Sequence, residues 1–294
     1  MENDHQNATA QGIEISADGK TLEKCPEDLV EIVIPNGVTT IGENAFYCRT
    51  RLESVVIPDS MTTIGDRAFF GCGNLENIVI PDSVTTIGNG AFLGCGNLEN
   101  IVIPDSVMTI EEHAFSLCPG LKSVVIPSGI TVIKKFAFRN CAGLKSVVIP
   151  DSVTAIEDEA FICCRSLKTI VIPDRVTTIG QRAFAHCWSL ASVEIPDSVR
   201  SIGGGAFSGC KRLESIVIPD SVREIGDGAF WECENLQSVE IRNGGMVIGR
   251  NVFRDCPGLK SIKTPNGDFN GGNLDEWTIP LRVKDEPEIS VILR

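Results

Sequence analysis

The chain has 294 residues, and 43% of them are hydrophobic, which is enough for a substantial core and excludes a disordered protein. Its 39 acidic and 26 basic side chains give a formal net charge of -13. Nucleic acid is therefore not an expected partner, because phosphate binding depends on an excess of clustered cations. The sequence has no apolar run of about 18 residues, so it predicts no transmembrane helix.

The first 28 residues predict a small cap. Ile13-Glu14-Ile15 and Thr21-Leu22-Glu23 have the composition of two short strands, and Asp18-Gly19 between them is typical of a turn. We expect residues 1–28 to form a hairpin that covers the first of a series of repeats, since the open end of a repeat array needs a cap.

A 23-residue repeat fills residues 29–262. Phenylalanine recurs at this spacing from Phe46 to Phe253 and leucine from Leu29 to Leu259, and proline follows the same period. The unbroken spacing replaces the two-domain organisation that length alone would suggest. It predicts one solenoid of about ten to eleven stacked units, none of which is stable alone.

Each unit has room for little more than two short strands and a turn, as residues 52–74 illustrate. The alternation at Val55-Val56-Ile57 predicts a strand with Val56 facing outward, and Pro58 ends it because proline cannot donate to a strand ladder. Ile64 belongs to a second short segment that faces the interior. Ala68-Phe69 and the cysteine that follows are expected to fill the interior from a short helical or 3₁₀ turn.

The repeated run L-x-x-V-x-I-P-x-x-V-x-x-I-G-x-x-A-F-x-x-C closely resembles the BspA-like class of leucine-rich repeats. The resemblance covers residues 29 to about 262. It implies an α/β leucine-rich-repeat solenoid, mainly β, with parallel strands on the concave face and a short second strand. It also implies a non-enzymatic protein of the cell surface, with adhesion or partner binding as the common theme.

Residues 263–294 depart from the repeat. The period dissolves in the stretch from Pro265 to Gly272, and the tail ends on the apolar run Ile289-Ser290-Val291-Ile292-Leu293. This region is either a C-terminal cap or the start of a further region, and the residues themselves favour neither.

Cysteine is the residue type that most suggests a chemical role, in disulfide bonds or metal binding. Nine of the 12 cysteines follow the 23-residue period from Cys72 to Cys256. Neighbouring thiols in such a column lie within disulfide range, but parallel stacking aims their Cβ atoms the same way, so we expect buried apolar filler. The chain has no C-x-x-C pair, and zinc is not expected.

Catalytic residues are not expected either. His186 precedes Cys187, but that cysteine belongs to the buried column, whereas a reactive thiolate needs exposure and a cationic neighbour. We therefore expect no enzyme, no cofactor and no metal.

An aspartate follows the proline of most units, as at Asp59, Asp82 and Asp105. A row of carboxylates could bind cations, but one carboxylate per unit is sparse for calcium. We expect each aspartate to cap its own turn.

The outward residues of the strands form the candidate partner-binding face. A row of exposed apolar residues interrupted by two glutamates, with small hydroxyl residues beside it, suits a protein or an extended peptide. The alternative is that β-branched residues recur only because they form strands well. The candidate residues are Val56, Val79, Val102, Val125, Val148, Val171, Glu194, Val217 and Glu240, with Ser123, Ser146 and Thr169 beside them.

One charged column changes sign along the chain, from Glu53, Glu76 and Glu99 to Lys122, Lys145 and Lys168. It creates a local basic zone that could select an acidic partner, or it records duplication of the repeats.

The leading hypothesis is a non-enzymatic protein-binding or adhesion module. The alternatives are a structural spacer that carries a functional domain beyond the C-terminus and an intracellular interaction scaffold. The resemblance favours the cell surface or secretion. Because the N-terminal residues have no cationic and apolar signal-peptide pattern, a cytoplasmic location is the alternative.

Overall fold

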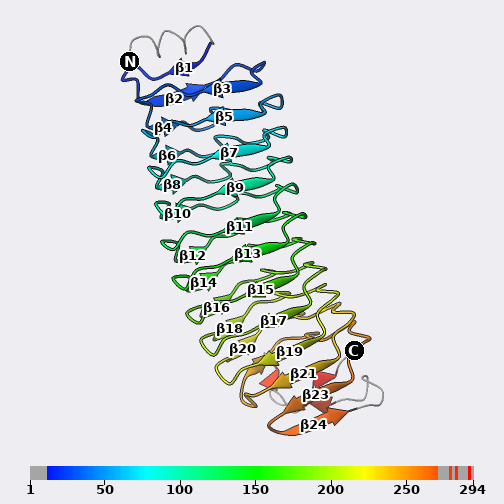
Figure 1. Ribbon diagram of the computed structural model, residues 1–294. Coiled ribbons are helices and arrows are strands. Elements are labelled where there is room, and N and C mark those ends of the chain that lie inside the picture. Colours follow the sequence, from blue (N-terminus) through cyan, green and yellow to red (C-terminus); the bar gives the residue numbers. More distant parts are fainter. Residues whose placement is uncertain (1–11, 271–277, 280–281, 284–290, 293–294) are drawn as a thin grey trace. The chain divides into compact units, whose positions relative to one another are not determined.

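The computed structural model describes residues 12–270, 278–279, 282–283 and 291–292. These residues form two compact units. Unit 1 comprises the described residues up to Ile130 together with Phe136–Pro150, and unit 2 comprises Thr131–Lys135 and the described residues from Asp151 onward. Each unit is a mainly-β solenoid of stacked 23-residue coils, and Figure 1 shows the coils following one another along the chain.

Unit 1 begins with the predicted hairpin, in which β1 (Glu14–Ile15) pairs antiparallel with β2 (Thr21–Lys24). Strand β2 then pairs in parallel with the second short strand of the first coil and so opens a six-stranded sheet. The assignment of residues 1–28 as a separate cap stays a prediction. The other strands of this sheet are β4 (Thr40–Ile41), β6 (Thr63–Ile64), β8 (Thr86–Ile87) and β10 (Thr109–Ile110).

A second six-stranded parallel sheet forms another side of unit 1. Its strands are three residues long, and each pairs with the equivalent residues of the next coil, as Val55 does with Ile78. A register of one full repeat keeps equivalent side chains on the same side of the sheet. The strands are β3 (Glu31–Val33), β5 (Ser54–Val56), β7 (Asn77–Val79), β9 (Asn100–Val102), β11 (Ser123–Val125) and β13 (Ser146–Val148).

Unit 2 has the same organisation. One parallel sheet contains β12 (Val132–Ile133), β14 (Ala155–Ile156), β16 (Thr178–Ile179), β18 (Ser201–Ile202), β20 (Glu224–Ile225), β22 (Val247–Ile248) and β26 (Arg282–Val283). The longer strands are β15 (Thr169–Val171), β17 (Ser192–Glu194), β19 (Ser215–Ile218), β21 (Ser238–Ile241) and β23 (Ser261–Thr264), and the antiparallel partner of β23 is β24 (Gly267–Asn270). Strands β25 (Thr278–Ile279) and β27 (Val291–Ile292) pair antiparallel. Most of residues 263–294 lies outside the described residues, so the two interpretations of that region stay open.

The core of each coil is a ring of apolar side chains around one phenylalanine. In unit 1 the rings of Phe46, Phe69, Phe92 and Phe115 stack in order, with centroids 4.7 to 5.3 Å apart and nearly parallel planes. Unit 2 has a phenylalanine column of the same kind, with a centroid spacing of 5.4 Å between Phe161 and Phe184. Offset stacking of buried rings adds to the area that each ring removes from water.

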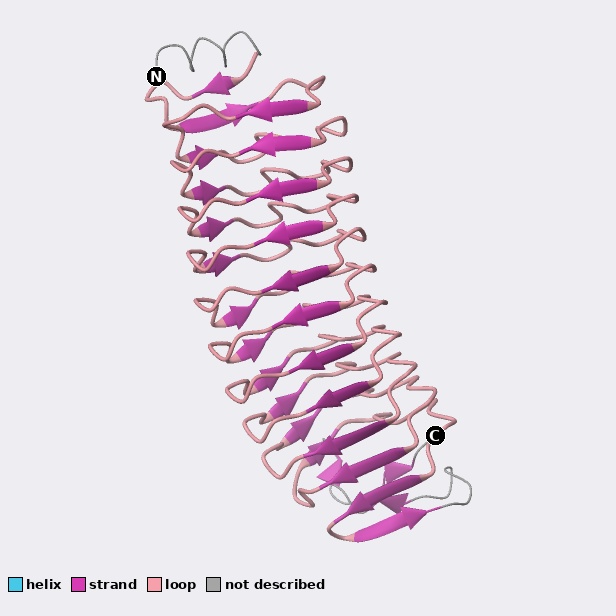
Figure 2. Cartoon of the chain, in the orientation of Figure 1, coloured by secondary structure: helices cyan, strands magenta, loops and turns pink. Residues whose placement is uncertain are grey.

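The expectation of a short helical or 3₁₀ turn is wrong, because the described residues contain no helix (Figure 2). The segment around the phenylalanine is a run of turns in which every second N–H group bonds to the next coil. Phe46 donates to the carbonyl of Ala68 at 2.8 Å, whereas Tyr47 donates to Asn44 in its own coil at 2.9 Å. A helix would return all of these bonds to its own coil.

Two left-handed residues in each coil enforce this path. Asn44 has a φ of 58° and Cys48 a φ of 56°, and the equivalent residues of the other coils also have positive φ. Glycine occupies some of these positions at no steric cost, as at Gly90 and Gly94, while bulky residues such as Phe136 occupy others. The first position comprises Asn44, Arg67, Gly90, His113, Phe136, Glu159, Arg182, Gly205, Gly228 and Asn251, and the second comprises Cys48, Gly71, Gly94, Leu117, Asn140, Cys163, His186, Gly209, Glu232 and Asp255.

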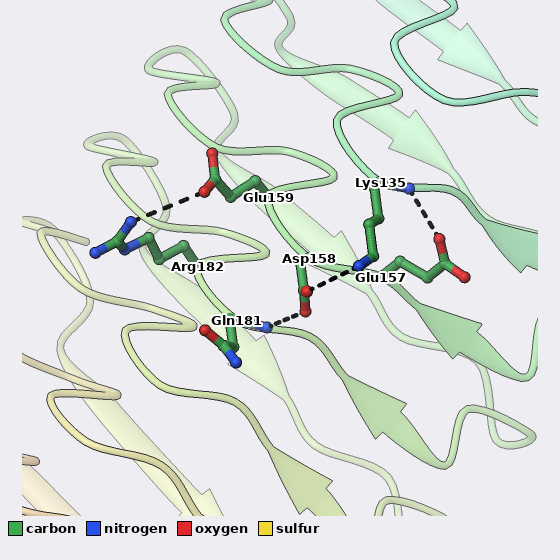
Figure 3. A network of polar contacts seen from close by, with 6 residues as sticks. All are labelled: Lys135, Glu157, Asp158, Glu159, Gln181 and Arg182. Carbon is green, nitrogen blue, oxygen red and sulfur yellow. Dashed lines mark hydrogen bonds and ion pairs between the residues drawn. The ribbon is translucent and has the colours of Figure 1, made fainter. Parts of the chain in front are cut away.

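Side-chain carboxylates close gaps between coils at the turn after the second strand (Figure 3). In unit 2, the Oδ1 atom of Asp158 accepts the backbone N–H of Gln181 at 2.8 Å, and its Oδ2 atom lies 3.4 Å from Lys135 Nζ. Gly180 lets the two coils approach this closely, since a Cβ there would lie 2.5 Å from the backbone N of Asp158 and 2.8 Å from its Oδ1. Glu157 accepts the N–H of Lys135 at 3.0 Å. The carboxylates of one coil therefore accept backbone N–H groups from the coil before it and from the coil after it.

Replacing Phe92 with alanine tests the stacked core. We expect Phe92→Ala to lower the free energy of unfolding by about 3–5 kcal/mol, because it leaves a cavity between two rings and removes both stacking contacts. Leu117→Ala is the control, since Leu117 is an exposed side chain of the next coil, and its effect should stay within about 0.5 kcal/mol. Urea titrations followed by circular dichroism measure both, and equal effects would contradict a core organised around the phenylalanine column.

Candidate functional site

The outward residues of the longer strands in unit 1 form a continuous apolar row, which we call the valine face. It consists of the third residue of each strand, and the register places each valine beside the next, as Val79 lies beside Val102. Between 56% and 75% of each of these valines is exposed, whereas the middle residue of every strand is buried. The valine face comprises Val33, Val56, Val79, Val102, Val125 and Val148, on the strands β3 to β13 of Figure 1.

The structure therefore places five candidate residues together, from Val56 to Val148. Ser123 and Ser146 are exposed and paired with each other two residues before the valines of their strands, where the sequence predicted a hydroxyl border. The candidate set omitted Val33. Its position 23 residues before Val56 was the signal that could have found it.

In unit 2, glutamate alternates with valine on the equivalent face. Val171 pairs with Glu194, and Val217 pairs with Glu240. Val171 is 77% exposed, whereas Val217 is 39% exposed and lines a depression of the surface. Thr169 is exposed at the start of the Val171 strand. Glu194 and Glu240 therefore separate the valines of this face in unit 2.

The depression is a hollow of about 540 Å³ with mixed chemistry. Arg242 stands where most units have proline, and its Nε atom lies 2.9 Å from Glu240 Oε1. This hydrogen bond and the charge of Glu240 raise the pKa of Arg242, and the guanidinium forms a charge-assisted hydrogen bond with the Glu240 carboxylate. The lining side chains include Asp174, Glu194, Asp197, Ser192, Ser215, Val217 and Arg242.

The aspartates after proline do not form the predicted turn caps in the described residues. Asp105 instead accepts the backbone N–H of Ser128 in the next coil at 3.2 Å. In several coils the following serine bonds to the preceding coil instead, as Ser60 Oγ donates to the carbonyl of Val38 at 2.7 Å, whereas the hydroxyls of Ser83 and Ser221 make no such bond. The physical reason is that the hydroxyl reaches a carbonyl of the preceding coil, which leaves the neighbouring carboxylate in solvent.

The cysteine column is buried, as predicted, and it also contributes hydrogen bonds. Thiols of the column donate to the carbonyl of the phenylalanine 26 residues earlier, as Cys72 does to Phe46 at 3.0 Å and Cys256 to Phe230 at 3.1 Å. Burial raises the pKa of Cys72, Cys118 and Cys210 to about 12. Burial likewise raises the pKa of Cys187, so this thiol and His186 do not form a nucleophilic pair. The described residues contain no cluster of side chains that could hold a metal ion.

Comparison with known proteins identifies the repeat. Residues 19–145 and 177–280 match the BspA type leucine-rich repeat region. The chain belongs to the BspA-type leucine-rich repeat family. Members of this family are repeat scaffolds of protein interaction. None of the curated proteins compared with the chain shows significant similarity to it.

Solved structures give the same fold. A leucine-rich repeat protein from Bacteroides ovatus is 33% identical, with a TM-score of 0.78, over 85% of this chain and 68% of that one. The pneumococcal vaccine antigen PcpA is 20% identical, with a TM-score of 0.54, over 85% of this chain and 71% of that one. A leucine-rich repeat protein from Eubacterium ventriosum is 19% identical, with a TM-score of 0.51, over 86% of each chain. The last two share the fold alone with this chain.

Thiol labelling tests the burial of the cysteine column. Cys48 is exposed and Cys163 is partly exposed, whereas the other ten cysteines are buried. We expect Ellman's reagent at pH 8 to react rapidly with these two thiols in the native protein, and with the rest only in denaturant. The double variant Cys48→Ser/Cys163→Ser should lose the rapid phase, and rapid reaction of further thiols would contradict a closed core.

Alkaline pH tests the raised thiol pKa values. A thiol whose folded pKa is about 12, against an ordinary value of 9, stabilises the fold fully below pH 9 and loses that contribution as pH rises toward 12. Each such thiol should cost roughly 1.4 kcal/mol per pH unit in that window. The urea midpoint of Cys118→Ala should therefore fall less steeply above pH 9 than that of the parent protein. Parallel curves would contradict the shift at Cys118.

Proposed function

We propose that the chain is a non-enzymatic binding module that presents the valine face to a protein or extended peptide. The observation that carries the proposal is the exposure of six adjacent valines on a sheet whose other side is completely buried. Soluble proteins rarely leave a contiguous apolar row of this kind exposed without a partner. Membership of a family of protein-interaction scaffolds supports the same function.

The sheet also suits binding because it is preorganised. Each valine is held by a strand whose neighbours on both sides pair in the same register, as at β7 between β5 and β9. A partner that lies across these strands therefore orders little of the module when it binds, which limits the entropic cost of association. The serine and asparagine side chains beside the row, such as Asn77 and Ser123, offer hydrogen bonds at its border.

We further propose display at the cell surface with an adhesive role, on the strength of the family resemblance. No helix among the described residues is long and apolar enough to cross a bilayer.

The unit 2 hollow, with Glu194 and Val217 in its lining, is a second contact region on the same type of strand.

Peptide selection with matched variants tests the function. A phage library of random peptides is selected on the immobilised protein. The binding of each enriched clone is then compared between the parent protein and the variant Val56→Asp/Val79→Asp/Val102→Asp. We expect the clones to bind the variant at least about tenfold more weakly, since buried charge without a partner costs several kcal/mol.

The control places the same three charges on the same three coils but on the other sheet, as Thr62→Asp/Thr85→Asp/Met108→Asp. These three residues are exposed beside β6, β8 and β10. The control should retain capture, and circular dichroism should show both variants folded. Capture that survives the valine substitutions would refute the valine face as the binding site.

A further inference from the structure

The charged residues on both sides of the valine face are all acidic in three consecutive coils. Three residues before each valine stands a glutamate, at Glu53, Glu76 and Glu99, and three residues after it stands an aspartate. All six carboxylate side chains belong to exposed residues. The apolar row of Val56, Val79 and Val102 therefore runs between two acidic rows. The second row is Asp59, Asp82 and Asp105.

Little in the described residues neutralises these rows. Glu99 Oε1 lies 3.6 Å from Lys122 Nζ, and Asp105 accepts hydrogen bonds from Ser128. Within the described part of the chain, the carboxylates of Glu53, Glu76, Asp59 and Asp82 have neither an ion pair nor a hydrogen bond. The sequence between Arg67 and Lys122 contains no lysine or arginine, although it contains six acidic residues. A cationic partner would supply the missing charge.

The spacing of the rows favours a helix over an extended strand. Three residues of chain span at most about 10 Å, so each acidic row lies within reach of long cationic side chains on the flanks of a helix that rests on the valines and is ~10–12 Å wide. Along the row, neighbouring coils lie about 4.8 Å apart. Successive helical turns rise about 5.4 Å, so a helix stays within about 1 Å of register over three valines. Same-side residues of an extended strand lie about 6.6 Å apart and lose register by about 4 Å over the same distance.

We propose that the valine face around Val79 binds a cationic amphipathic helix. Its apolar side chains, at positions i, i+3, i+4 and i+7, contact Val56, Val79 and Val102, and lysines or arginines on both flanks reach the two acidic rows. The inference rests on the proposed function, because it specifies the partner of the same face. The negative charge of the surface opposes both a second copy of this chain, whose net charge is also -13, and an anionic membrane.

The experiment uses a synthetic 18-residue peptide with leucine on one helical face and lysine on both flanks. Its affinity for the full chain is measured by fluorescence anisotropy in 50 mM and 500 mM NaCl. We expect binding at low salt that weakens at high salt. A peptide with glutamate in place of lysine should not bind, and a peptide with two central prolines should bind at least about tenfold more weakly, because proline breaks the helix. Equal binding of either control peptide would overturn the proposal.

Variants of the protein assign the two rows separately. Glu53→Gln/Glu76→Gln and Asp59→Asn/Asp82→Asn should each lower affinity about fivefold at low salt, as two exposed ion pairs would. Glu111→Gln/Glu112→Gln is the matched control, since it removes the same charge from a turn away from the strand face, and its effect should stay within about twofold. If one row alone affects binding, a helix held on both flanks is wrong.

Valine variants separate failure of this inference from failure of the proposed function. Val56→Ser/Val79→Ser/Val102→Ser should abolish binding of the lysine peptide. If these substitutions abolish capture of the phage-selected peptides while the acidic variants change nothing, the face binds partners but the cationic helix is wrong. If neither set changes binding of any ligand, the proposed function fails as well. Dimerisation lost on the valine substitutions, or adsorption to phosphatidylserine vesicles, would overturn the helix as occupant.

Discussion

Backbone hydrogen bonding between coils at a register of one full repeat is the constraint on which the rest of each unit depends. The pairing of Val55 with Ile78 repeats at the other strands, and the N–H of Phe46 reaches Ala68 on another side of the coil. Because bonds leave the coil on all its sides, an isolated coil would lose most of them together with the stacking of its phenylalanine. Cooperative stacking, rather than local secondary structure, is therefore the source of stability.

The same register produces the candidate site. A repeat position that faces outward in one coil faces outward in every coil. One outward valine per repeat is therefore enough to form a row. Variation within the row then sets its chemistry. Glu194 and Arg242 convert the equivalent face of unit 2 from an apolar row into a charged hollow. In unit 1 the row stays apolar, and the acidic residues beside Val79 give it one sign of charge.

The columns show how far periodicity carries an interpretation and where it ends. The inward phenylalanines, the buried cysteines and the exposed valines from Val56 to Val148 follow from the 23-residue spacing alone. The turn after Pro58 does not, because Asp59 and Ser60 are both good capping residues and only the position of Val38 in the preceding coil decides that the serine makes the bond.

The amino-acid sequence by itself determined the repeat length, the family, the inward and outward sides of each strand and the buried cysteine column, because these depend on the periodic placement of side-chain types. Only the tertiary structure decided that the third side of each coil is a run of turns. The sequence around Ala68-Phe69 favours a helical turn locally, but left-handed backbone at Arg67 and Gly71 directs alternate N–H groups to the next coil. The choice between a helical turn and this run of turns depends on hydrogen bonds to residues of the next coil, about 23 positions away. Local propensity does not include such contacts. The charged hollow beside Val217 has the same origin, since its lining comes from four different coils.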